Sequence, residues 1–165
     1  MELKRVVVTG LGAITPIGNT IPEFWSNAIK GVSGAGLITY FDASKFKTQF
    51  ACEVKGFDPL QFFERKESHK MDQYTQFALV VADEAISDSG INLEKEDLNK
   101  IGVIYGAGIG GIRTFEREVS NYFLHQEDGP RFNPFFIPMM ISDIAAGQIS
   151  IKYGFHGPNY ATCSA

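Results

Sequence analysis

The sequence predicts an α/β fold built around a parallel β-sheet. Two short runs rich in β-branched and aliphatic residues, at 4–9 and 100–105, and a third run at 158–164 are interpreted as strands, and segments with helical periodicity lie between them. The second run leads through a glycine-rich loop into a helix. Because strands that alternate with helices are joined by crossover connections, this order favours parallel strand pairing.

Composition favours one globular domain. The chain has 165 residues, 44% of them hydrophobic, and a chain of this size buries about two-thirds of its unfolded surface. A net charge of −4 gives no general basic field, which disfavours nucleic-acid binding. No apolar run reaches the roughly 20 residues of a membrane span, and no signal-peptide profile follows Met1. We expect a cytoplasmic protein with no nucleic-acid or membrane partner.

The first predicted strand and helix lie near the N-terminus. Residues 4–9 read Lys-Arg-Val-Val-Val-Thr, a continuous apolar run that suits a strand covered on both faces. A loop over 10–18 follows. Residues 23–29 predict a short helix, because Pro22 is a favourable first helical residue and Gly31 a stop.

The middle of the chain combines an irregular segment with the clearest helix. Residues 33–70 show poor periodicity, many aromatic residues and frequent turn residues, which predicts an irregular insertion. Residues 72–89 carry apolar side chains at three- and four-residue spacing and end at Gly90, which predicts an amphipathic helix.

The second half of the chain predicts a further strand, loop and helix unit and then another helix and strand. In chain order these are a strand at 100–105, the loop Gly106–Gly111, a helix at 114–124, a Pro- and Phe-rich stretch at 130–138, a helix at 140–153 and a strand at 158–164.

The glycine loops invite a dinucleotide-binding interpretation that the neighbouring sequence does not favour. Gly106, Gly108 and Gly111 satisfy GxGxxG between a strand and a helix. The cofactor motif also needs a strand that ends in an acidic residue about 20 positions on, and residues 126–130 predict a turn instead. Gly10 and Gly12 begin a similar pattern without its third glycine. We therefore interpret both loops as tight turns with close backbone approach.

Cysteine and histidine spacing predicts neither a metal site nor a disulfide framework. Cys52 and Cys163 lack paired spacing, and the three histidines are far apart. We expect free thiols, no metal and no cofactor.

Four segments, in order along essentially the whole chain, carry a resemblance to a known family. They are Arg5-Val-Val-Val-Thr-Gly-Leu-Gly12 with Pro16-Ile-Gly-Asn19, Arg65-Lys-Glu, Gly106-Ala-Gly-Ile-Gly-Gly111, and Gly157-Pro-Asn-Tyr-Ala-Thr-Cys-Ser-Ala165. Together the chain resembles the N-terminal half of type II, elongating β-ketoacyl-acyl-carrier-protein synthases, and four motifs in register are far more specific than one.

The resemblance implies a thiolase-like fold of two similar α/β halves in five αβαβα layers, assembled as a homodimer. Residues 1–165 would form the first half, with the insertion at about 33–70, and the C-terminal half would be absent. The implied activity is that of an acyltransferase of fatty-acid biosynthesis, a branch of lipid metabolism: a cysteine thiolate takes an acyl chain from acyl carrier protein, malonyl-carrier-protein is decarboxylated, and the two are condensed.

The resemblance also implies that no catalytic residue lies in this chain. Family spacing from Gly157 places the nucleophilic cysteine immediately after Ala165, inside a Ser/Thr-Ala-Cys motif, and Cys163 falls on a strand position where we expect a small buried residue. Two histidines and a lysine used for decarboxylation belong to the second half. We expect the 165-residue chain to be inactive alone.

Seven residues match substrate or partner positions of the family. Ile109 would act as a gate beside the acyl pocket, and Phe136 would lie near that pocket and the dimer interface, with ordinary core packing as the alternative. Five residues would dock the acidic acyl carrier protein, or would otherwise form a solvated basic face. These are Arg65, Lys66, His69, which stands where arginine is common, Lys70 and Arg131.

Three other functions remain open. A non-condensing relative, such as a chain-length factor, would carry another residue in place of the nucleophile. A nucleotide-binding oxidoreductase would rest on the GxGxxG match alone. An interaction module would need no thiolate.

Overall fold

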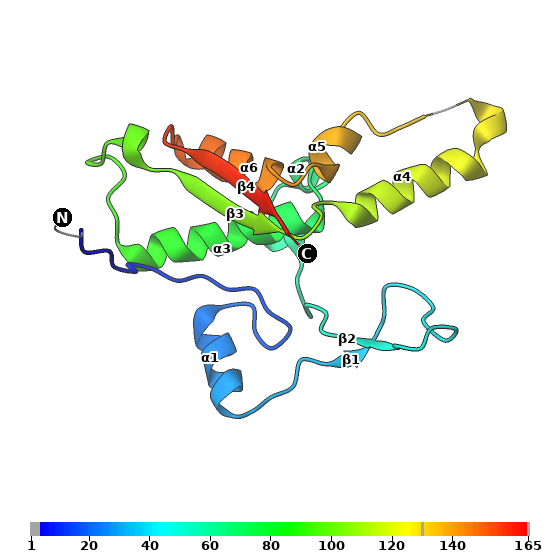
Figure 1. Ribbon diagram of the computed structural model, residues 1–165, viewed down its shortest axis with the longest axis horizontal. Coiled ribbons are helices and arrows are strands. Elements are labelled where there is room, and N and C mark those ends of the chain that lie inside the picture. Colours follow the sequence, from blue (N-terminus) through cyan, green and yellow to red (C-terminus); the bar gives the residue numbers. More distant parts are fainter. Residues whose placement is uncertain (1–3, 130, 165) are drawn as a thin grey trace. The chain divides into compact units, whose positions relative to one another are not determined.

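The computed structural model describes residues 4–129 and 131–164, and the chain divides into two compact units, drawn together in Figure 1. The first unit comprises the described part of Met1–Asp58 together with Val80–Ile91, and the second comprises Pro59–Leu79 and the described residues from Asn92 onward. Helix α3, Gln73–Ser89, contributes residues to both units.

In the first unit, helix α1 spans Ile21–Ile29 and confirms the helix predicted at 23–29. The Thr20 hydroxyl accepts a hydrogen bond from the Glu23 main-chain N–H at 3.3 Å, and the Glu23 carboxylate in turn accepts one from the Asn19 N–H at 2.8 Å. This reciprocal arrangement resembles a capping box and fixes the start of the helix. Gly31, at φ +68°, follows its last turn.

The strand predicted at 4–9 is not formed. These residues have no helix or strand assignment, and the side chains of Val6 and Val8 are 90% and 81% exposed. The prediction was wrong because a β-branched run becomes a strand only beside a partner edge that satisfies its N–H and C=O groups. No described strand pairs with it.

The glycines that follow lie against the second part of α3, as the tight-packing interpretation requires. A Cβ atom on Gly10 would lie 2.1 Å from the Ala85 carbonyl oxygen, and one on Gly12 would lie 2.1 Å from that of Val81. Only glycine permits the main chain to approach the helix so closely.

The segment predicted to be irregular contains only short elements. In the first unit, β1, Gly36–Leu37, pairs antiparallel with β2, Phe50–Ala51. In the second unit, a 3₁₀ turn, η1, spans Pro59–Gln61 and helix α2 spans Arg65–Ser68.

Helix α3 confirms the long helix predicted at 72–89. Asp72 precedes it, and its carboxylate accepts a hydrogen bond from the Tyr74 N–H at 3.2 Å. Gly90, at φ +63°, follows the last residue of the helix, as the sequence predicted.

The second unit contains the parallel strand pair. Strand β3, Val103–Ala107, pairs parallel with β4, Asn159–Cys163, in a register from Val103 opposite Asn159 to Ala107 opposite Cys163. Helix α6, Ile144–Tyr153, packs against both strands, and Figure 1 shows it beside β4. The predicted parallel pairing is confirmed. The first of these strands begins three residues later than predicted, after the 3₁₀ turn η2 at Leu98–Lys100.

Three residues of these strands are exposed. Ile104 and Tyr160, which face each other across the pair, are 76% and 61% exposed. Cys163 is also exposed, although a buried position was expected. Side chains alternate between the two faces of a strand, so Cys163 points to the face opposite that of Tyr160. Asn159, on the same face as Cys163, bonds to Ala146 and Ser150 of α6, which places Ile104 and Tyr160 on the face that α6 does not cover.

The remaining helices differ modestly from the predicted ranges. Helix α4 spans Ile112–Leu124 and is followed by the 3₁₀ turn η3 at Gln126–Asp128. The helix predicted at 140–153 is divided, because Ile141 is extended between α5, Phe136–Met140, and α6. Pro130, at the start of the Pro- and Phe-rich stretch, lies outside the described residues. None of the described helices is both long enough and apolar enough to cross a membrane.

Candidate functional site

The glycine loop, Gly106–Gly111, is held against the end of α5 by its main chain. The Gly111 N–H donates to the Met140 carbonyl oxygen at 2.9 Å, and a Cβ atom on Gly111 would lie 2.1 Å from the Met139 oxygen. Gly110 adopts φ +88°, and a Cβ atom there would lie 2.4 Å from the Met140 oxygen. These glycines therefore serve close backbone packing, and the Gly111 N–H at the start of α4 is already bonded and not free to bind a phosphate.

A pocket of about 690 Å³ opens beside this loop. Its walls come from the glycine loop and the first turn of α4, from the connection between α5 and α6, and from the start of β4. Apolar side chains predominate, and Ser142, Asp143 and Asn159 add polar groups. A mostly apolar cavity with a few polar groups is the usual form of a small-molecule site. The residues that line it are Ile109, Ile112, Phe115, Met140, Ile141, Ser142, Asp143, Asn159, Tyr160 and Ala161.

The two residues expected to line a substrate pocket lie at different distances from this one. Ile109 is in the wall, and its side chain is 64% exposed. Phe136 does not line the pocket, but its ring packs 6.2 Å, centre to centre, from the ring of Phe115, which does. The ring of Phe132 stacks on that of Phe136, with the ring centres 5.5 Å apart.

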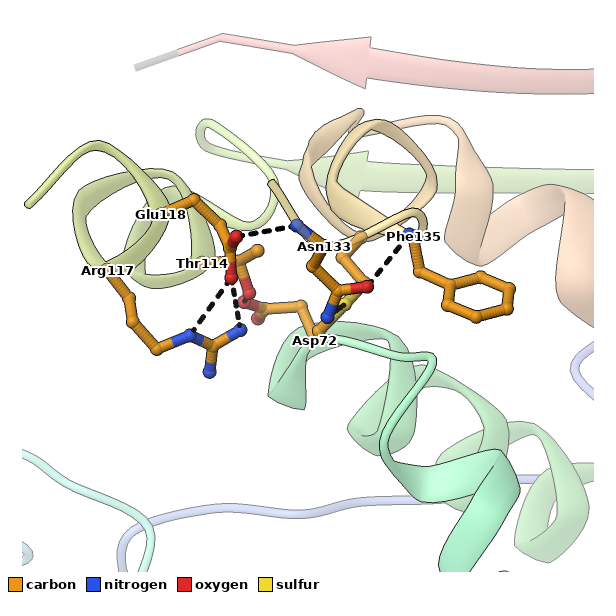
Figure 2. A network of polar contacts seen from close by, with 7 residues as sticks. Asp72, Thr114, Arg117, Glu118, Asn133 and Phe135 are labelled. Atoms are coloured by element: carbon orange, nitrogen blue, oxygen red, sulfur yellow. Dashed lines mark hydrogen bonds and ion pairs between the residues drawn. The ribbon is translucent and has the colours of Figure 1, made fainter. Parts of the chain in front are cut away.

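A polar network holds α4 to its neighbours, as Figure 2 shows. The hydroxyl of Thr114, 2% exposed, donates to the Asp72 carboxylate at 2.6 Å. One turn further along, the carboxylate of Glu118, 7% exposed, accepts from the Asn133 main-chain N–H at 2.9 Å. The Arg117 guanidinium lies 3.5 Å from the same carboxylate. The segment at Asp72, before α4, and the segment at Asn133, after it, are thus fixed to the same side of this helix.

Burial changes the acidity of two tyrosines in the second unit. It raises the pKa of Tyr105 above the ordinary value of 10.0. Burial also raises the pKa of Tyr74, an effect that the Thr75 hydroxyl offsets in part and that the carboxylate of Asp72 reinforces. The Tyr74 hydroxyl donates to the carbonyl oxygen of Ile141, in the pocket wall.

Four of the five basic residues expected to bind a partner lie together on and after α2. We call Arg65, Lys66, His69 and Lys70 the basic cluster. The first three are exposed. Lys70 is half-buried, with its ammonium group 2.7 Å from the Glu67 carboxylate and 5.6 Å from the centre of the Phe135 ring.

Arg131, the fifth, is not part of this cluster. It lines a separate hollow of about 480 Å³ with Asn121, Tyr122 and His125, at the C-terminal end of α4. The contact between Thr114 and Asp72 ties the other end of α4 to the segment that follows α2. Thr114 and Tyr122 are about 12 Å apart along the helix axis, so the two basic sites are distinct.

Cys163 lies at the end of β4, beside the pocket wall. The Cys163 thiol lies 2.7 Å from the hydroxyl of Ser142, a wall residue. Ala165, the residue after which a nucleophile was expected, lies outside the described residues. Within residues 4–129 and 131–164, no three His, Cys, Asp or Glu side chains gather as metal ligands.

Sequence reasoning missed the polar network and most of the pocket wall. The one available signal was the spacing of Thr114 and Glu118, four residues apart and hence on one side of a helix. Their partners Asp72 and Asn133 are distant in sequence and could not be assigned by spacing.

Comparison with known proteins places the chain in a family. The model of the β-ketoacyl synthase N-terminal domain matches residues 3–165. The chain is 43% identical over 162 residues to 3-oxoacyl-[acyl-carrier-protein] synthase 2 of Staphylococcus aureus (strain COL), covering 98% of this chain and 39% of that protein. The protein of the same name from Synechocystis sp. is 45% identical over 166 residues, covering 100% and 39%. The chain thus spans well under half the length of these relatives.

Solved ketosynthase structures show the same fold. The ishigamide ketosynthase/chain length factor aligns with a TM-score of 0.79 at 22% identity, over 95% of this chain and 39% of that one. The ketosynthase complex AntDE:AntF, which includes a type II polyketide synthase acyl-carrier protein, aligns with a TM-score of 0.73 at 26% identity, over 97% and 41%. The expected thiolase-like α/β fold is confirmed. Because the family model covers almost every residue, the chain belongs to the β-ketoacyl synthase family, of which it carries the N-terminal domain.

Proposed function

We propose that this chain is the N-terminal half of a type II 3-oxoacyl-acyl-carrier-protein synthase, which condenses malonyl-carrier-protein with an enzyme-bound acyl chain in fatty-acid elongation. The observation that carries the proposal is the apolar pocket beside the glycine loop, in a chain 43% identical to an enzyme of that name. A saturated acyl chain needs an apolar wall and few polar partners.

Within this proposal Ile109 gates the pocket. Its branched side chain stands between glycines and borders the cavity, so a change of rotamer would alter the opening without moving a strand or helix. Phe136 supports the wall through Phe115. It does not border the cavity itself.

The basic cluster would dock the acidic acyl carrier protein. Arg65, Lys66 and His69 are exposed and close in sequence on a protein of net charge −4, so they form a local attraction for an acidic partner. Arg131 would make a second, separate contact. An acyl-carrier protein is bound to its ketosynthase in the AntDE:AntF structure, which supports this class of partner.

The catalytic groups would lie beyond Ala165. The nucleophilic cysteine would follow at the end of β4, and the two histidines and the lysine would come from the second half of a thiolase-like homodimer in the cytoplasm. A thiolate at a helix N-terminus is stabilised by the helix dipole, and backbone N–H groups there stabilise the oxyanion formed during acyl transfer. The 165 residues alone would be inactive.

The test compares the complete polypeptide that the gene encodes with residues 1–165. Each is incubated with acyl- and malonyl-carrier-protein, and 3-oxoacyl product is measured by mass spectrometry after a parallel iodoacetamide labelling. We expect product and rapid labelling of a cysteine directly after Ala165 in the complete polypeptide only. Absence of that cysteine and of product would indicate a non-condensing relative such as a chain-length factor, and product from the 165-residue chain would contradict the proposed division of the site.

A further inference from the structure

Glu118 is buried in α4 and is not one of the residues that line the pocket. Its partners are the Asn133 main-chain N–H at 2.9 Å and the Arg117 guanidinium at 3.5 Å, and the side chain of Arg117 is 55% exposed. A buried carboxylate is costly unless hydrogen bonds compensate for its lost hydration. Glu118 therefore holds the Asn133 main chain in a defined place.

The helix that bears Glu118 is fixed on the same side. Thr114, one turn earlier, donates to Asp72 at 2.6 Å, and Figure 2 shows both contacts leaving α4 toward the other segments. Asp72 also caps α3 through the Tyr74 N–H. Glu118 is thus attached to a fixed helix and can act as an anchor.

Asn133 is hydrogen-bonded to the residues at the start of α5. Its side-chain oxygen accepts from the Phe135 N–H at 2.9 Å, and its main-chain oxygen accepts from the Phe136 N–H at 2.8 Å. These two bonds form the turn from which α5 begins. Displacement of Asn133 would move the first residues of the helix.

The other end of α5 forms the pocket wall. Met140 and Ile141 line the pocket, and the Met140 carbonyl oxygen accepts from the Gly111 N–H at 2.9 Å. Because α5 has only five residues, or about 7.5 Å of helix, a shift at its start reaches its end. The glycine loop packs on that end without room for a methyl group, so it would follow.

We propose that Glu118 is a positioning residue that, through Asn133 and α5, sets the wall of the acyl pocket and hence which acyl chain lengths the pocket accepts. The inference rests on the proposed function, because it concerns the same pocket. Glu118 touches no reacting group. Its effect reaches substrate through Met140, Ile141 and the glycine loop that carries Ile109.

The test uses the complete polypeptide with four variants. Glu118→Leu removes the acceptor at similar volume, whereas Glu118→Gln keeps an acceptor oxygen. Asn133→Ala removes the side-chain oxygen that accepts from the Phe135 N–H, at the next step of the same link. Glu116→Leu makes the same substitution as Glu118→Leu at an exposed position of the same helix. Hydrogen–deuterium exchange is measured over residues 131–141, and kcat and KM are measured for a medium-chain and a long-chain acyl primer.

We expect Glu118→Leu and Asn133→Ala to increase exchange over 131–141 and to change the ratio of kcat/KM between the two primers by about tenfold, mainly through KM. Glu118→Gln should stay within about twofold of wild type, and Glu116→Leu should match wild type. An unchanged primer ratio in Asn133→Ala, or in Glu118→Leu if it folds, would overturn the proposal. An equal change in Glu116→Leu would do the same.

The activity of the wild-type polypeptide distinguishes a failure of this proposal from a failure of the proposed function. Wild-type polypeptide that makes no 3-oxoacyl product would refute the enzymatic function and the role in chain-length selection together. Wild-type activity with faster exchange in Glu118→Leu but an unaltered primer ratio would refute the positioning role alone.

Discussion

Two glycines of the loop beside the pocket have very different surroundings. Gly111 has no room for a Cβ atom, which would lie 2.1 Å from the Met139 carbonyl oxygen, whereas a Cβ atom on Gly108 would meet no atom within 4 Å. Both belong to the same loop and the same GxGxxG pattern. Only the contacts distinguish a required glycine from a replaceable one.

This difference predicts opposite outcomes for the same substitution. Gly111→Ala should lower the free energy of unfolding by about 2 kcal/mol, because overpacking against main-chain atoms forces a backbone shift. Gly108→Ala should change it by less than about 0.5 kcal/mol. Urea denaturation followed by circular dichroism measures both, and equal losses would mean that the contact of Gly111 with α5 is not as described.

Tyr74 and Tyr105 predict a specific loss of stability in alkali. Burial raises the pKa of both hydroxyls above 10.0 in the folded chain. Above about pH 10 the unfolded chain therefore releases protons that the folded chain retains, and stability falls as the pH rises. Unfolding midpoints between pH 8 and 12 should decline less steeply in the Tyr74→Phe and Tyr105→Phe double variant than in wild type. Parallel curves would contradict the buried environment of these hydroxyls.

At the scale of elements, α3 organises the N-terminal segment through acidic side chains. The Glu84 carboxylate accepts hydrogen bonds from the Ala13 and Ile21 main-chain N–H groups, both at 2.8 Å. Asp88 accepts one from the Leu11 N–H at 2.9 Å. Residues 10–21 thus satisfy part of their backbone by bonding to a helix instead of to a strand.

Glu84→Leu should release this segment. Two main-chain donors lose their acceptor, which should cost about 2 to 4 kcal/mol of stability. Glu84→Gln should lose less, because one amide oxygen remains. The control is Glu96→Leu, at an exposed position. Unfolding free energies and amide exchange over 10–21 report the outcome, and unchanged exchange in Glu84→Leu would show that these bonds do not hold the segment.

At the scale of the whole molecule, the charges are distributed unevenly. The net charge is −4, yet the basic cluster gathers Arg65, Lys66, His69 and Lys70 within six residues of chain. An acidic partner would be repelled by the average field and attracted by this patch. Such local attraction mainly affects the rate of encounter and its dependence on salt.

Lys66→Glu should therefore weaken binding of acyl carrier protein to the complete polypeptide by about fivefold at low salt, and the difference from wild type should shrink at high salt. Lys95→Glu makes the same charge change at another exposed position. Fluorescence anisotropy of labelled carrier protein measures the dissociation constants. Equal weakening by both substitutions would indicate a response to net charge and not a docking surface.

Elements whose signals are local could be predicted from the sequence. Helices α1 and α3 were predicted from Pro22, the apolar spacing along 72–89 and the glycines that follow them, because capping and periodicity act within a few residues. Strands β3 and β4 were predicted from the runs at 100–105 and 158–164, and their parallel pairing followed from the crossover between them. The family motifs identified the family for the same reason, since each motif is contiguous.

Which of these residues are paired, buried or exposed depends on tertiary contacts. The apolar run at 4–9 met every local criterion for a strand, but no described strand pairs with it and its residues are exposed. Nothing in the sequence distinguishes Glu118 from the other charged residues of its helix, yet it is buried against Asn133, 15 residues away. Pairing, burial and the pocket wall depend on contacts between distant residues, and neither spacing nor propensity along the chain encodes which distant groups will meet.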